Sequence, residues 1–139
     1  MALTTLCTTD QLAAQLTEWR AFDCRHDLLK AELGALQYRE SHIPGALFAS
    51  FETDLSAPKT GKNGRHPLPA PGTFAAWLGR QGIRPDDQVV CYDAGNGSMA
   101  ARLWWMLRWI GHGPVAVLDG GLAKWVKEGR PFESGPPAE

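Results

Sequence analysis

Strand-like and helix-like patterns alternate through the second half of the chain. Residues 88–92 and 115–118 are short apolar runs rich in β-branched residues, which predict strands. Apolar residues at helical spacing occupy 73–82, 99–110 and 122–129, and each of these runs ends at or beside a glycine. This alternation predicts a parallel sheet with helices on both faces. Because such sheets bind ligands beyond the carboxyl ends of their strands, the loop after Tyr92 is the first place to expect a site.

The first half is less regular, and its elements are expected to be short. A capped helix is predicted from Thr9 to Leu16, a buried strand over 19–23, a helix over 27–38 and a short strand over 46–48. Prolines and glycines crowd residues 56–72 too densely for a helix or a central strand. This segment is predicted to be a long surface loop, and its basic residues are Lys59, Lys62 and Arg65.

Composition excludes several classes of protein. The 139 residues suit one domain, and a net charge of −1 argues against a general nucleic-acid binder. No apolar run approaches the ~20 residues of a membrane span, so no membrane partner is expected. The N-terminus lacks the pattern of a signal peptide. Three cysteines at unrelated spacings indicate free thiols in a reducing compartment, and we expect the cytoplasm.

Four motifs, in order, resemble those of the rhodanese sulfurtransferases. They are Phe22-Asp23-x-Arg25, His42-Ile43-Pro44-Gly45-Ala46, Val89 to Asp93 with Arg102-x-Trp104-Trp105 and Gly111-His112, and Leu118-Asp119-Gly120-Gly121-Leu122-x-x-Trp125. The resemblance covers roughly Asp10 to Ser134. It implies an α/β, rhodanese-like three-layer domain with a central, mostly parallel sheet. Residues 1–134 are expected to form this domain, and residues 135–139 to begin an interdomain linker or a disordered tail.

The resemblance implies a specific chemistry that this chain is missing. Rhodaneses move sulfane sulfur from thiosulfate or 3-mercaptopyruvate to an acceptor through a cysteine thiolate, held in a loop of inward-pointing backbone amides. Asp93 stands at that position here. A carboxylate holds no persulfide, and its charge would fill the space meant for the thiolate. The loop is therefore predicted to be vestigial, and we expect no catalytic residue, cofactor or metal in this domain; the loop residues are Asp93, Ala94, Gly95, Asn96, Gly97 and Ser98.

The three cysteines do not replace the missing one. Cys91 is expected to be a buried, inert thiol within a strand, and Cys7 to be incidental. Cys24 leaves two interpretations open: a surface thiol without a role, or a thiol activated by the neighbouring Arg25 and His26. No Cys-x5-Arg motif is present, which excludes the phosphatases that share this fold. Arg102, Trp104 and Trp105 are expected to be structural.

His66 is the best candidate for a chemical role. Its His-x-Leu-Pro segment is similar to one in the first domain of tandem sulfurtransferases, where the histidine and an acid help to polarise a serine of the second domain. The acid falls near Glu52 in this chain; the alternative is that His66 is an ordinary loop histidine.

Two functions follow from the resemblance. One is the non-catalytic N-terminal domain of a sulfurtransferase, with a second rhodanese domain and a small anionic sulfur donor as partners. The other is a free-standing inactive module for protein binding or regulation.

Overall fold

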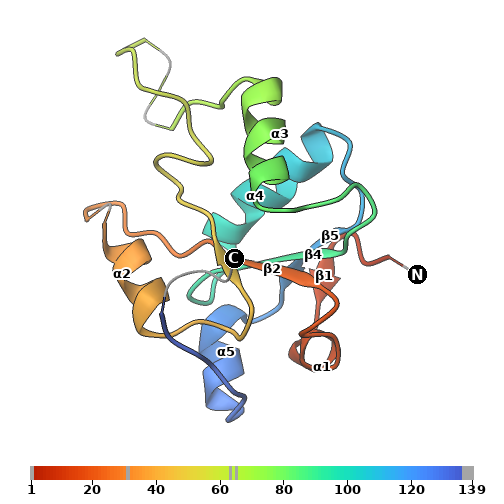
Figure 1. Cartoon of the computed structure of the whole chain (residues 1–139). Coiled ribbons are helices and arrows are strands. Elements are labelled where there is room, and N and C mark those ends of the chain that lie inside the picture. The colour runs from red at the N-terminus through yellow and green to blue at the C-terminus, as the bar shows by residue number, and fades with distance from the viewer. Residues whose placement is uncertain (1, 31, 63, 65, 136–139) are drawn as a thin grey trace.

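Among the described residues, five short parallel strands form one sheet in the order β1-β5-β4-β2-β3. The sheet lies at the centre of the molecule (Figure 1). The computed structural model describes residues 2–30, 32–62, 64 and 66–135. The strands are β1 (Leu6–Cys7), β2 (Arg20–Asp23), β3 (Leu47–Phe48), β4 (Val89–Tyr92) and β5 (Val115–Leu118). The helices are α1 (Thr9–Ala13), α2 (Leu33–Glu40), α3 (Pro71–Arg80), α4 (Ser98–Trp109) and α5 (Gly121–Lys127). Every strand pairing is parallel, so the predicted α/β fold is confirmed.

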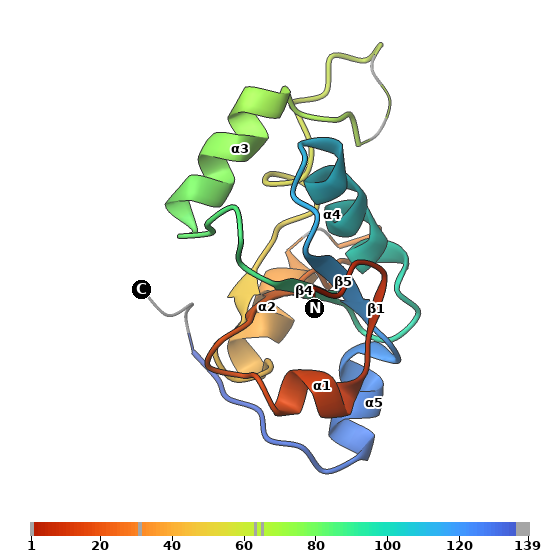
Figure 2. The ribbon, with the colours of Figure 1, turned by 90° about the vertical axis from the view of Figure 1, so that its right-hand side faces the viewer.

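Helices cover both faces of this sheet and form two separate cores. Phe22, Val89 and Cys91 point to the face covered by α3 and α4. Their alternating neighbours, among them Val90 and Tyr92, point to the face covered by α1, α2 and α5. Figure 2 shows the two groups of helices on opposite sides of the strands. The inner strands β4 and β5 are largely buried on both faces, which explains why their sequences are continuously apolar.

Several predicted boundaries are wrong for local reasons. Helix α3 begins at Pro71, not at Thr73, because proline at the first helical position loses no hydrogen bond. Helix α2 begins at Leu33, well after residue 27, because the Asp27 carboxylate accepts the amides of Leu29 (2.8 Å) and Lys30 (3.0 Å) and holds a turn there. Thr8 caps α1 through a capping box.

Two further features could not be seen in the sequence. Strand β1 was not expected, because two residues carry no readable periodicity. Trp105 does not enter the core: its side chain is 46% exposed and stacks on Trp109. Trp104 does have a structural role, since its indole donates a hydrogen bond to the carbonyl of Thr4 (2.9 Å).

The described part of the C-terminal segment is anchored and not frayed. Glu133 and His42 exchange two backbone hydrogen bonds of 2.8 Å in an antiparallel bridge. The amide of Gly135 donates to the carbonyl of Arg39 (2.8 Å). Residues 136–139 of the predicted linker lie outside the described residues, as does Arg65 of the basic loop.

None of the described helices has the length and hydropathy needed to cross a membrane.

Replacing Gly34 by alanine tests the packing of α2. A Cβ atom at Gly34 would lie 2.2 Å from the carbonyl oxygen of Arg25, whereas one at Gly79, within α3, would meet nothing within 4 Å. We expect Gly34→Ala to lower the free energy of unfolding by about 1–3 kcal/mol. Gly79→Ala, the matched control, should raise it by up to about 1 kcal/mol. Urea denaturation measures both, and equal midpoints would contradict this packing.

Candidate functional site

The carboxyl ends of the parallel strands bring several chain segments together at one edge of the sheet. The loop after β4 lies there beside the segment after β2. Together they line a depression of about 160 Å³, formed by Arg25, His26, Asp93, Ala94, Gly95, Asn96, Ser98 and Met99. Ligand pockets usually exceed about 300 Å³, so this depression alone is small for a substrate site.

The carboxylate of Asp93 occupies the centre of the loop. Its Oδ1 accepts the amides of Gly95 and Gly97, and its Oδ2 accepts those of Met99 and Ala100, each at 3.0 Å. The residue is 3% exposed. These donors converge where α4 begins, which is the arrangement that proteins use to hold an anion. The carboxylate of Asp93 therefore lies where a bound anion would lie in such a loop.

The Asp119-Gly120-Gly121 turn holds this loop against α5. The amide of Leu122 donates to the carbonyl of Asp93, and that of Ala123 to the carbonyl of Ala94, both at 2.9 Å. Gly121 has a φ of +59°, and a Cβ atom there would lie 2.8 Å from the carbonyl oxygen of Asp93. The sequence indicated only a turn at this position. The structure adds that glycine is required for the two backbones to meet.

A buried ion pair fixes the segment after β2. The Arg25 guanidinium lies 2.7 Å from Oδ2 of Asp23, and it also donates to the carbonyl of Ser41 (2.6 Å). Asp23 is fully buried. The pair thus connects the end of β2 to the start of the His42–Ala46 turn.

Glu52 and His66, predicted as a pair, are in contact. Nε2 of His66 lies 3.1 Å from Oε1 of Glu52. This hydrogen bond lowers the pKa of Glu52 below its ordinary value. His26 was missed as a member of this group, although its Nε2 lies 3.8 Å from the same oxygen. Burial lowers the pKa of His26 below 6.5.

Arg102 positions the backbone that carries His66. Its Nη2 donates to the carbonyls of Leu55 (2.7 Å) and His66 (2.9 Å), and its guanidinium lies 5.3 Å from the centre of the Phe51 ring. The predicted structural role of Arg102 is therefore specific: it ties α4 to the residue before the long loop and to His66 within it. Lys59 and Lys62 of that loop are exposed.

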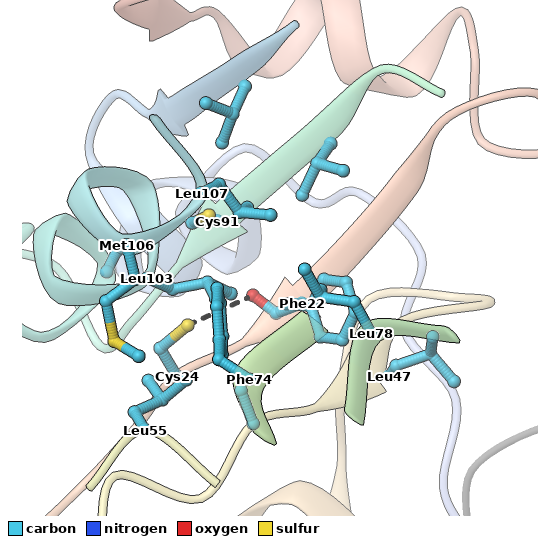
Figure 3. Close-up of a cluster of buried hydrophobic side chains, with 14 of the residues drawn as sticks. Phe22, Cys24, Leu47, Leu55, Phe74, Leu78, Cys91, Leu103, Met106 and Leu107 are labelled. Carbon is cyan, nitrogen blue, oxygen red and sulfur yellow. Dashed lines mark hydrogen bonds between the residues drawn. The ribbon is translucent and has the colours of Figure 1, made fainter. Parts of the chain in front are cut away.

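The cysteines offer no reactive thiol. Both interpretations of Cys24 are wrong, because the side chain is fully buried in the core (Figure 3). Burial first, and the neighbouring Cys91 second, raise the pKa of Cys24 well above its ordinary value. Cys91 is buried as predicted, and burial raises the pKa of Cys7 to about 11. With these raised pKa values, Cys7 and Cys24 are protonated near neutral pH and are poor nucleophiles.

Comparison with known proteins gives a consistent picture. The family model for the rhodanese-like domain matches residues 8–128. A probable 3-mercaptopyruvate sulfurtransferase of Pseudomonas aeruginosa is 49% identical over 139 residues, covering 97% of this chain and 49% of that protein. The 3-mercaptopyruvate sulfurtransferase of Escherichia coli is 40% identical over 103 residues, covering 73% of this chain and 35% of that protein.

Among solved structures, a 3-mercaptopyruvate sulfurtransferase from Leishmania major superposes with a TM-score of 0.90 at 34% identity. The superposition covers 98% of this chain and 38% of the Leishmania chain. The chain thus spans about half or less of the length of these relatives.

Replacing Asp93 by asparagine tests whether the loop depends on the carboxylate. An amide group presents one oxygen and one donor to four amide donors, so two of the four N–H groups would lose their acceptor. We expect Asp93→Asn to lower the free energy of unfolding by about 1–3 kcal/mol in urea denaturation. The exposed Asp119→Asn is the control and should change it little. An unchanged midpoint for Asp93→Asn would show that solvent satisfies these amides equally well.

Proposed function

The chain belongs to the rhodanese-like domain family, and from that premise we propose that it is the non-catalytic N-terminal domain of a two-domain sulfurtransferase. The parent enzyme would move sulfur from 3-mercaptopyruvate or thiosulfate to a thiophilic acceptor. The observation that carries this proposal is the Asp93 carboxylate, which accepts all four amides of the loop in which the family holds its reactive cysteine.

The chain has no substitute for that cysteine. A carboxylate oxygen forms no persulfide, and Cys7, Cys24 and Cys91 are all buried. A donor anion would also find these four amides already occupied by the carboxylate of Asp93. The sulfur-carrying step therefore belongs to a second domain. The relatives support this assignment, since each is at least about twice as long as the part that this chain matches.

In this proposal the chain contributes His66 and Glu52 to the site on the second domain. In the tautomer with a proton on Nε2, His66 donates a hydrogen bond to Oε1 of Glu52, which fixes the ring orientation. The His66 side chain remains 20% exposed, so a partner domain can reach it. The opposite ring nitrogen would polarise a hydroxyl group of that domain near the bound donor.

The unpaired thiols also indicate the redox environment in which the protein folds. Cys24 and Cys91 interact within one core and remain unpaired. Free neighbouring thiols suit a reducing environment, which supports a cytoplasmic location.

The isolated chain should be inactive. Incubated with thiosulfate and cyanide, it should form no thiocyanate above a blank without protein, because no thiolate is available. The positive control is a protein that joins this chain to the part of the Pseudomonas relative that it does not cover. Turnover by the chain alone that disappears on Cys24→Ser or Cys91→Ser would contradict the proposal.

The joined protein also tests His66. We expect His66→Ala to slow its 3-mercaptopyruvate reaction by about tenfold or more, since acid–base groups contribute at least that much. His112→Gln is the matched control: His112 bonds to the carbonyl of Asp87 (2.8 Å) at the opposite ends of the strands, and its replacement should leave the rate unchanged. Pyruvate release measures both. If the second domain is equally fast without this chain, the binding-module alternative takes its place.

A further inference from the structure

Three side chains that commonly bind metals converge beside the Asp93 loop. We propose that His26, Glu52 and His66 form a binding site for a divalent cation of the zinc class. One ligand atom from each of the three residues lies within 4.8 Å of the other two. Two imidazoles and a carboxylate are an established ligand set for zinc.

The distances are close to those that a tetrahedral ion requires. Oε1 of Glu52 lies 3.1 Å from Nε2 of His66 and 3.8 Å from Nε2 of His26. Ligand atoms of tetrahedral zinc are about 3.3 Å apart, given metal–ligand bonds of about 2.0–2.1 Å. Small rotations of the side chains would bring the three ligand atoms to that spacing. The bound ion would replace the His66–Glu52 hydrogen bond, because a ring nitrogen that binds a metal carries no proton.

His26 provides an independent indication of a missing ligand. Its side chain is 3% exposed, and its buried Nε2 has no hydrogen-bond partner among the described residues. The nearest carboxylate oxygen, on Glu52, is at 3.8 Å, beyond hydrogen-bonding distance. Buried polar atoms almost always have a partner, so this one calls for an explanation. A cation between the three residues would accept its lone pair.

Phe51 orients both imidazoles. The His26 ring stacks on it, with centroids 5.0 Å apart and planes at 21°. The His66 ring meets it edge-on, at 4.5 Å and 77°. Arg102 fixes the backbone of His66 through the 2.9 Å hydrogen bond to its carbonyl. The ligands are thus held by packing before any ion arrives, which reduces the entropy lost on binding.

The site is reachable from solvent and incomplete by one ligand. Glu52 is 30% exposed and His66 is 20% exposed, whereas His26 closes the inner side. Three protein ligands leave the fourth position of a tetrahedral ion to water or to a small anion. The alternative is a simple His66–Glu52 hydrogen bond beside a buried neutral histidine, with no affinity for metals.

Titration of the chain with Zn²⁺ decides between them. The chelator-treated 139-residue chain should bind one Zn²⁺ in calorimetry. Co²⁺ should give the visible absorption of a tetrahedral site without a thiolate charge-transfer band, which excludes the cysteines as ligands. His26→Phe keeps the stacking on Phe51, and Glu52→Gln keeps a hydrogen bond to His66. Each should weaken binding at least tenfold.

Asp27→Asn is the matched control, because it removes a charge next to His26 without removing a ligand. It should change the affinity by less than about twofold if direct ligation, not local charge, holds the ion. Urea denaturation of each variant checks folding. Binding well below one equivalent, or equal affinity for wild type, His26→Phe and Glu52→Gln, would overturn the proposal. The measurement uses the metal and the chain alone, so its outcome is independent of the sulfurtransferase assignment.

Discussion

Four backbone amides point into one small buried volume at the end of β4, and the rest of the site depends on the hydrogen-bond acceptor that lies there. Unpaired, each would carry the free-energy cost of a buried donor without an acceptor. One carboxylate, that of Asp93, accepts all four. With the loop closed in this way, α4 can begin at Ser98 and α5 can pack its first turn against the same loop at Gly121. The loop after β4, the starts of α4 and α5, and the candidate site therefore all depend on the hydrogen bonds that the Asp93 carboxylate accepts.

Much of the fold was readable from the sequence, because buried parallel strands and their connecting helices have strong periodic patterns. Strand β5 has the predicted bounds, Val115–Leu118. The failures lie where a single local interaction decides. The Asp27 carboxylate delays α2, and proline brings the start of α3 forward. Strand β1 forms through its pairing with β5, which no property of two isolated residues could reveal.

The candidate site was predictable only in part. Glu52 and His66 were paired through the resemblance to tandem sulfurtransferases, and Nε2 of His66 lies 3.1 Å from Oε1 of Glu52. The prediction missed His26, because its approach depends on how the segment after β2 packs against Phe51. Cys24 was misjudged for the opposite reason: its charged neighbours in sequence suggested an activated thiol. In the structure Arg25 turns to Asp23, and Cys24 faces the apolar core. Sequence neighbours indicate which charges are available but not the direction in which they point.

A carboxylate in the loop has a consequence for how this face of the protein behaves over time. A cysteine in the same place would change its chemical form as it gained and lost sulfur, and it could be oxidised by peroxide. Asp93 undergoes neither change, and its surroundings hold it at 3% exposure. The loop consequently keeps a single electrostatic state whatever the supply of sulfur or the redox conditions. A neighbouring surface that packs on this face therefore contacts a loop of constant chemical form. A surface around a reactive cysteine changes in charge and shape with every turnover.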